Sequence, residues 1–252
     1  MYSTQLTNSQ WQVMQSILND NRKRKYDLHS IMNAILYLLK TGCQWRMLPR
    51  EFPPYRTVFY YFRKWATMGV WKKLNHALNM LFRQQSGREP SPSVAIMDSQ
   101  SVKNSERGVC EKGYDGNKKI NGRKRHIIVD TLGLLLAVKV HAANIHDSKG
   151  AFELIDEFDR EKYVRMRKII ADKAYRGDLE GYCKGKNLEL DIAPGLEGRK
   201  ASFEVIPQRW KVERSISWFQ WNRRLSRDFE AETSSSEAIA LISNIKRIIR
   251  NF

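Results

Sequence analysis

Apolar side chains recur every three or four positions through residues 1–90, which is the spacing of one face of an α-helix. In the first such stretch Ser9 is the expected N-cap, and the apolar positions are Trp11, Met14, Ile17 and Leu18. The same pattern, interrupted by glycine and proline, predicts helices over residues 8–20, 28–40, 55–66 and 69–83. This part of the chain is therefore expected to be all-helical.

The pattern changes after residues 84–93, whose glycine and prolines predict a linker. Short apolar runs typical of strands then alternate with helical segments. Strands are predicted at 94–98, 126–130, 134–141, 168–172 and 188–193, and helices at 148–158, 178–186, 207–224 and 236–249. The polar, glycine-rich stretch 104–122 predicts a loop or a β-excursion. This order of elements favours an α/β fold of the ribonuclease-H-like class, a mixed sheet flanked by helices, over residues 91–252.

The charge of the chain is strongly basic. Its 252 residues include 44 Lys and Arg against 27 Asp and Glu, a net charge of +17. The excess is +10 in residues 1–90 (14 basic, 4 acidic) and +7 in residues 91–252 (30 basic, 23 acidic). Such an excess favours nucleic acid as a partner, because neutralised phosphates release counterions. A basic chain that is merely soluble is the alternative. Residues 1–90 are thus a candidate DNA-binding region.

Cysteine spacing and hydropathy argue against other classes of protein. The three cysteines are far apart and form no C-x-x-C motif, which favours reduced thiols and argues against a zinc site or a disulfide framework. The sequence contains no signal-peptide pattern and no apolar run of about 20 residues. We expect a cytoplasmic protein with no membrane association.

Three acidic residues are candidates for catalysis. Asp98 and Asp172 each end an apolar, strand-like run, and Glu213 lies in a helical segment. Carboxylates at the ends of neighbouring strands, joined by one from a helix, can hold two magnesium ions for phosphoryl transfer. Each acid also has a purely structural interpretation. The aspartates could be turn or helix-cap residues, and Glu213 could be a surface i,i+4 partner of Arg209. The combination of three acids in this element order favours a catalytic site.

Five phrases of the sequence carry a resemblance to a known family. They are Asp-Ser-Gln-Ser-Val-Lys at 98–103, Gly-Arg-Lys-Arg-His at 122–126, Ala-Asp-Lys-Ala-Tyr-Arg-Gly at 171–177, Arg-Trp-Lys-Val-Glu-Arg at 209–214 and Trp-Arg-Met-Leu-Pro at 45–49. In this order they resemble the DDE transposases of bacterial insertion sequences, specifically the compact class with a single protein of about this length. One departure is that Ile206 and Gln220 stand where related transposases often carry a Tyr and a Lys.

The resemblance implies a transposase that binds the terminal inverted repeats of a mobile element, cleaves a DNA strand and joins it to target DNA. It implies Asp98, Asp172 and Glu213 as the catalytic residues and as ligands of two Mg²⁺ ions, with Mn²⁺ as an alternative. Hard oxygen ligands fit these ions and do not fit zinc. Because such chemistry acts on the two paired ends of the mobile element, the resemblance further implies a homodimer on double-stranded DNA. It also implies a bacterial protein associated with the nucleoid.

Several basic side chains are candidate DNA contacts: Arg22, Lys23, Arg24, Lys25, Arg123, Lys124, Arg125, Arg209 and Arg214. The cluster at 22–25 is expected to grip the element end, with a solvated loop as a nearly equal alternative. Residues 123–125 approach the expected active-site strands and could bind flanking phosphates. The last two of the set flank Glu213 and are available for DNA phosphates.

Histidine offers a competing metal site, which we do not expect. The dipeptide His146-Asp147 could ligate a metal, but such a pair arises easily by chance, and Asp147 is explained more simply as part of a helix cap. His126 and His141 are most simply strand residues. Two other functions stay open: a catalytically silent, transposase-derived DNA-binding repressor, and a metal-dependent DNA nuclease on the same fold.

Overall fold

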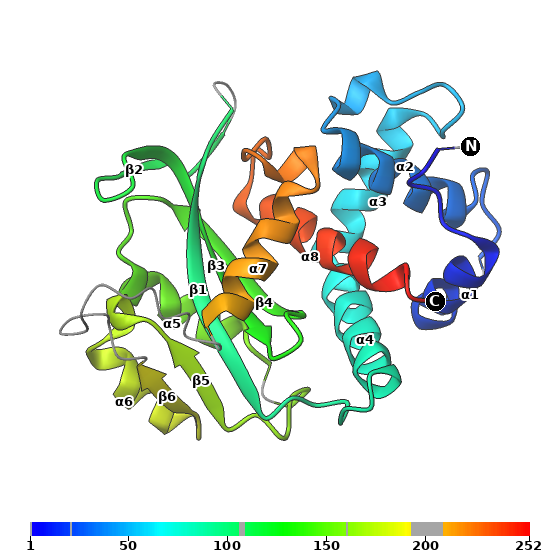
Figure 1. The fold of residues 1–252 in the computed structure, drawn as a ribbon. Coiled ribbons are helices and arrows are strands. Elements are labelled where there is room, and N and C mark those ends of the chain that lie inside the picture. Colours follow the sequence, from blue (N-terminus) through cyan, green and yellow to red (C-terminus); the bar gives the residue numbers. More distant parts are fainter. Residues whose placement is uncertain (1, 21, 106–108, 160, 193–208) are drawn as a thin grey trace.

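A computed structural model of the chain describes residues 2–20, 22–105, 109–159, 161–192 and 209–252. A group of helices lies beside a mixed sheet, and the last helix, α8 (Thr233–Ile249), lies between them (Figure 1). Both ends of the chain lie on the helical side (Figure 1). In the described ranges, no helix is long and apolar enough to cross a membrane.

The N-terminal region is helical, as the apolar spacing predicts. Its elements are α1 (Asn8–Leu18), α2 (Leu28–Thr41), the 3-10 helix η1 (Trp45–Met47), α3 (Tyr55–Thr67) and α4 (Val70–Gln85). The expected N-cap of α1 is wrong: Thr7, not Ser9, accepts a hydrogen bond from the Gln10 N–H, and the Gln10 side chain accepts one from Thr7 in return. Gly42, left-handed with φ of 70°, ends α2.

Six strands among the described residues form one mixed sheet. They are β1 (Val94–Lys103), β2 (Gly113–Asp115), β3 (Ile120–Asp130), β4 (Leu135–Ala142), β5 (Lys168–Ala171) and β6 (Glu189–Ile192). β3 is antiparallel to β1 and β4, whereas β5 is parallel to β1 and β6 is parallel to β5. The order across the sheet is β4-β3-β1-β5-β6, with the short β2 beside the start of β3. This is the ribonuclease-H-like arrangement, so the expected fold class is confirmed.

The two central strands are longer than their apolar runs predict. β1 continues past Asp98 to Lys103, and β3 begins at Ile120 instead of near residue 126. Their polar residues face each other across the ladder, Ser99 opposite His126 for example, so backbone pairing continues where the apolar pattern ends. Asp98 therefore lies in the middle of a strand, and the expectation that it ends one is wrong.

Successive side chains of β1 point into two separate cores, because the side chains of a strand alternate between its faces. Ile96 belongs to the core that contains α7 (Arg209–Gln220), α8 and the N-terminal helices. Met97 belongs to the core formed with α5 (Asp147–Glu157) and α6 (Asp178–Gly185). The first core joins both predicted regions of the chain. The two regions expected on either side of residue 90 thus share one continuous core, and the functional division there stays a prediction.

Buried asparagines fix α4 and α8 against the sheet. The amides of Asn75 and Asn79 both donate to the Leu135 carbonyl, at 2.7 and 2.8 Å. The amide of Asn244 on α8 donates to the side-chain oxygens of both, at 2.7 and 3.0 Å. Because buried polar groups must find partners, these contacts favour one register of the two helices on β4.

A buried ion pair joins α4 to the turn between β3 and β4. The Arg83 guanidinium pairs with the Asp130 carboxylate, and both side chains are buried. Asp130 also accepts hydrogen bonds from the N–H groups of Leu132 and Leu134, both at 2.9 Å. One carboxylate therefore holds both the turn and the adjoining helix.

Replacing Arg83 by Met should lower the free energy of unfolding by about 3–5 kcal/mol, because the Asp130 carboxylate would be left buried without its cation. Urea denaturation followed by tryptophan fluorescence measures the change. Lys73→Met, at an exposed position of the same helix, is the matched control and should cost less than about 0.5 kcal/mol. Equal losses in the two variants would contradict a role for the ion pair.

Candidate functional site

Asp98 lies on β1, and Asp172 directly follows β5, the parallel neighbour of β1 in the sheet. β1 and β5 are parallel and pair Ile96 with Ile170, and each aspartate follows two residues later in its strand direction. Both side chains are partly buried. Burial, followed by the negative charges of Asp98 and other carboxylates that include Asp172, raises the pKa of Tyr175 well above its usual value. Two of the three expected catalytic acids thus both lie close enough to Tyr175 to affect its pKa.

Each aspartate also has a local structural partner. The Asp98 carboxylate accepts a hydrogen bond from the Ser99 N–H at 2.7 Å. Asp172 is the N-cap of the 3-10 helix η2 (Lys173–Tyr175) and accepts from the Ala174 N–H at 2.9 Å. The helix-cap interpretation of Asp172 is therefore correct, but a carboxylate has about four acceptor positions, so the cap does not exclude a ligand role.

Glu213 lies on α7, which packs across β1 and β3 (Figure 1). Ser215 fixes this helix by donating to the Gly133 carbonyl at 3.0 Å, and Val212 enters the core beside Ile96, while Glu213 is exposed. In the part of the chain that the structure describes, no three carboxylate, imidazole or thiol groups converge to hold a metal ion. The structure thus places Glu213 on a helix over β1 without assembling a closed set of three ligands.

Part of the motif around Glu213 lies outside the described residues. Ile206, which stands where the family often has Tyr, and the side chain of Arg209 both fall there. Gln220 is the last residue of α7 and is exposed. Arg214 lies with its guanidinium carbon 4.6 Å from the ring centroid of Trp210 and 4.9 Å from that of Trp218, so two indoles hold it by cation–π contact.

A polar cluster beside Asp98, on the α5 face of β1, was missed by sequence reasoning. Asp147 pairs with Lys124 at 2.8 Å and accepts a hydrogen bond from the Ser99 hydroxyl at 3.2 Å. Burial alone would raise the pKa of Asp147, but its hydrogen bond with Lys124 and that residue's positive charge outweigh burial and hold the pKa below its usual value. The N-cap of α5 is His146, whose ring accepts a hydrogen bond from the Ser148 N–H. The expected capping role of Asp147 is therefore wrong, and its side chain points inward to Lys124 and Ser99.

Two histidines complete this cluster. His126 and His141 are strand residues, as expected, and their rings are in contact at a tilt of 32°, with centroids 4.7 Å apart. Their Nε2 atoms lie against Gly150, where an added Cβ would be 2.8 and 2.1 Å from them, so only glycine fits. His126 Nδ1 is 3.1 Å from the Tyr175 hydroxyl. Burial, then the nearby His141, lowers the pKa of His126 to about 3.

The basic residues at 123–125 are internal, which corrects their expected role as DNA contacts. Arg123 and Arg125 are 0% and 1% exposed, and both donate to backbone carbonyls of the segment 223–231. Arg123 also lies 3.5 Å from Asp228. Lys124, on the opposite face, is buried against Asp147. Because β3 already begins at Ile120, these side chains alternate into the two cores and do not reach solvent.

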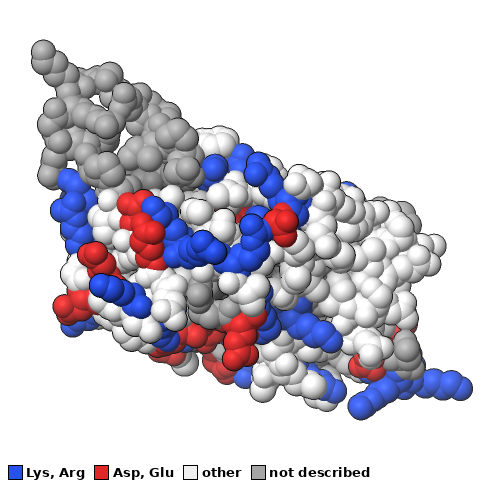
Figure 2. All heavy atoms as spheres, turned by 90° about the horizontal axis from the view of Figure 1, so that it is seen from below, with Lys and Arg blue, Asp and Glu red and all other residues white. Residues whose placement is uncertain are grey.

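The cluster at 22–25 has two kinds of side chain. Arg22, Lys23 and Lys25 are exposed. Arg24 instead pairs with Asp20 and donates to the Tyr61 hydroxyl at 3.1 Å, so it holds the loop in place. On the face shown in Figure 2, basic and acidic side chains are mixed on the left, the sheet side of Figure 1, and most of the right side is uncharged. The basic excess is therefore not one continuous patch on this face.

The buried His126 should make the protein sensitive to acid. Between pH 6.5 and 3 the unfolded chain binds a proton on this ring and the folded chain does not, so stability falls as the pH falls, by on the order of 4 kcal/mol. His126→Gln should lose this pH dependence, as measured by urea denaturation from pH 7 to pH 4. His146→Gln, at an exposed ring, is the control and should keep the wild-type slope. An unchanged slope for His126→Gln would contradict the assignment.

Comparison with known proteins gives two matches to family models. A model described as a transposase of the IS4/5 family matches residues 6–75, and a model described as a transposase DDE domain matches residues 89–245. A crystal structure of the Mos1 strand transfer complex is 9% identical, with 92% of this chain and 79% of that chain covered, and its TM-score of 0.24 is too low to carry an argument. No curated protein matches. The second model spans more than half of the chain, and the chain therefore belongs to the DDE transposase family.

Proposed function

We propose that this protein is an active transposase, which binds the terminal inverted repeats of a mobile element, cleaves a DNA strand at their boundary and joins it to target DNA. The single observation that carries the proposal is that Asp98 lies on β1 and Asp172 directly follows β5, the parallel neighbour of β1. Glu213, on the helix across β1, is the proposed third catalytic residue. Family membership supports a transposase that depends on a divalent metal.

The donor set fits Mg²⁺, with Mn²⁺ as an alternative, because all three side chains offer hard oxygens. We propose that Asp98, Asp172 and Glu213 would together hold two such ions. Once bound, such ions would activate the attacking oxygen and stabilise the leaving 3′ oxygen. Two neighbouring carboxylates repel each other, so a cation between Asp98 and Asp172 is favourable. Glu213 would join this set by turning from its exposed position.

The polar cluster behind β1 supports the site from the other face. Ser99 follows Asp98 directly, and its hydroxyl donates to Asp147, which Lys124 neutralises. Tyr175 follows Asp172 by three residues and packs edge-on against His126. These contacts anchor the backbone just after each aspartate. We therefore infer that Ser99 and Tyr175 are positioning residues, which hold the carboxylates of Asp98 and Asp172 at a fixed separation.

The proposed DNA contacts are Arg22, Lys23 and Lys25, together with Arg209 and Arg214 on α7, the helix that carries Glu213. Exposure of the first three supports a role on phosphates, since a buried cation could not reach the duplex. We further propose that two copies act on paired element ends as a homodimer. A protein with this substrate would work in the bacterial cytoplasm, at the nucleoid.

Replacing Asp98, Asp172 or Glu213 by Ala should reduce strand cleavage to background while specific DNA binding stays within about twofold, because each change removes a proposed metal ligand. The assay uses purified protein, Mg²⁺, a labelled duplex with the inverted repeats and a supercoiled target plasmid. Glu180→Ala, at an exposed acid on α6, should cleave like the wild type.

The outcomes separate the proposal from its alternatives. Label joined to the plasmid by the wild type, and lost in the three variants, would support a transposase. Cleavage without joining would point to a nuclease, and binding without cleavage in Mg²⁺ or Mn²⁺ to a silent DNA-binding repressor. Normal cleavage by Glu213→Ala alone would remove that residue from the site.

Replacing Arg22, Lys23 and Lys25 together by Gln should weaken DNA binding and reduce its salt dependence. Each lost phosphate contact lowers the slope of log K against log salt by about 0.9, so a change of about 2 to 3 is expected. Fluorescence anisotropy across a salt series measures it. Lys184→Gln, an exposed lysine on α6, is the control. An unchanged slope in the triple variant would mean that the cluster is a solvated loop.

A further inference from the structure

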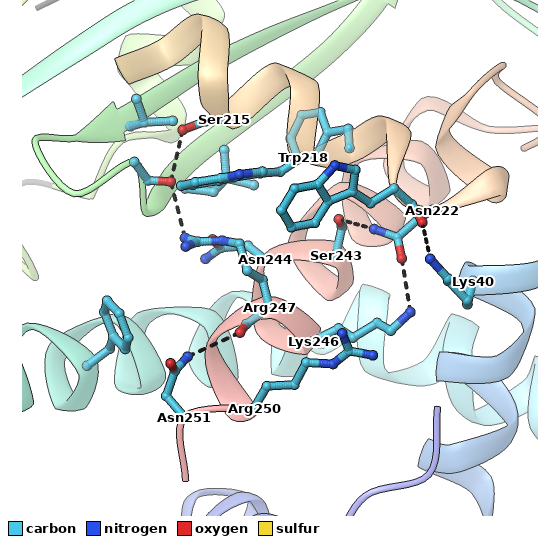
Figure 3. A pocket seen from close by; sticks show the side chains of 16 residues that line it. Lys40, Ser215, Trp218, Asn222, Ser243, Asn244, Lys246, Arg247, Arg250 and Asn251 are labelled. Carbon is cyan, nitrogen blue, oxygen red and sulfur yellow. Dashed lines mark hydrogen bonds between the residues drawn. The ribbon is translucent and has the colours of Figure 1, made fainter. Parts of the chain in front are cut away.

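A cavity lies beside α7 and α8, and neither Asp98 nor Asp172 lines it. It has a volume of about 420 Å³ and lies between α7, α8, α2 and the β3–β4 turn (Figure 3). Its walls carry the cations Lys40, Lys246, Arg247 and Arg250 and the indoles Trp218 and Trp221. Among the described residues that line it, none is acidic. The proposed strand-transfer chemistry does not use this cavity.

The cations of this cavity are held by neutral oxygens. Lys246, only 6% exposed, donates to the side-chain oxygen of Asn222 at 3.1 Å. Lys40 donates to the Trp221 carbonyl at 2.7 Å, and Arg247 donates to the Gly133 carbonyl at 3.2 Å. A buried ammonium that is paired only with an amide is costly, unless an anion joins it. The wall is therefore organised as an anion site.

The charges around Lys246 add to this argument. Burial, then the positive charges of Arg250 and Lys40, lowers the pKa of Lys246 to about 7. Figure 3 shows Lys246 and Arg250 extending from α8 on the same side of the cavity. An anion placed among these three cations would favour the charged form of Lys246 and draw a proton onto it.

The aromatic part of the cavity offers a surface for a flat ring. Trp218 is already covered by Arg247, whose guanidinium carbon is 4.0 Å from its ring centroid. Trp221 also lines the cavity and is 61% exposed. A base could stack on this indole while a phosphate reached Arg250 and Lys246. The volume is within the usual range for a small-molecule site, about 300–1,000 Å³.

We propose that this cavity binds a nucleotide, with its phosphate among Lys246, Arg250 and Lys40 and its base on Trp221. The same chemistry is carried by a free nucleotide and by a terminal nucleotide of a DNA strand. A ligand in this cavity would contact three helices: α8, α2 and α7, the last through Trp218. The site is separate from the proposed metal site and does not depend on it.

Isothermal titration of the purified wild-type protein tests the proposal with four probes: 2′-deoxyadenosine 5′-monophosphate, deoxyadenosine, inorganic phosphate, and a short duplex with or without a 5′-phosphate. The monophosphate should bind, and deoxyadenosine should bind at least about tenfold more weakly, because one charge-assisted contact is worth roughly 1.5–3 kcal/mol. Arg250→Gln, at an exposed position, should weaken binding of the monophosphate by a similar factor. Trp221→Ala should weaken binding of the monophosphate but leave binding of inorganic phosphate unchanged. Lys184→Gln is the matched control and should bind like the wild type.

Proton uptake provides a second measurement. Titrations at pH 8 in buffers of different ionisation enthalpy should show that the wild type takes up a proton with the ligand. Lys246→Met should abolish this uptake, whereas Arg250→Gln should retain part of it. Thermal unfolding establishes that each variant is folded before titration.

The probes also identify the source of the nucleotide. Binding of the free monophosphate that depends on Arg250 supports a small-molecule ligand. Binding restricted to the 5′-phosphorylated duplex, again weakened by Arg250→Gln, supports a strand end. Absence of binding by all phosphate-bearing probes, or equal affinity in wild type, Arg250→Gln and Lys246→Met, would overturn the proposal.

Discussion

The two-sided burial of β1 is the constraint on which the rest of the molecule depends. A strand buried on both faces sends neighbouring side chains into different cores, and here Ile96 and Met97 enter separate ones. Asp98 therefore shares the face of α7, whereas Ser99 shares the face of Asp147. A slip of one residue in the pairing with β3 or β5 would exchange these faces and separate Asp98 from Asp172. The register of one strand thus determines both the acidic pair and its supporting cluster.

Much of the fold could be predicted from the sequence, because apolar periodicity records which positions are buried. The order of strands and helices after residue 90 predicts the ribonuclease-H-like class. The short sequence motifs around Asp98 and Asp172 identify these two residues as candidates. Apolar periodicity does not predict which polar residues are buried. Arg123 and Arg125 read as surface cations because their partners, in the segment 223–231, lie about a hundred residues further along the chain. The missed role of Asp147 has the same cause, since Lys124 and Ser99 are distant in sequence.

Net charge is a poor measure of the surface that this protein offers to a polyanion. Several of its cations are internal and have structural partners: Arg83, Arg123, Arg125, Arg224 and Lys246 are all buried. Arg224, for example, pairs with Glu230 at 2.7 Å while Arg125 holds the carbonyl of the adjacent Leu225. Part of the basic excess therefore holds the C-terminal segment against the sheet. The strand at 122–126 is an example, because its cations are buried on both faces.

The position of α8 has a consequence for how the protein is made. This helix is the last element of the chain, yet nearly all of it is buried between the N-terminal helices and β4. During synthesis the first helices leave the ribosome long before the segment that completes their core, so their apolar faces stay uncovered until α8 has been made. A chain interrupted before Thr233 would lack this central helix. The apolar faces of the N-terminal helices and of β4 would then stay exposed to solvent, so such a chain should not fold.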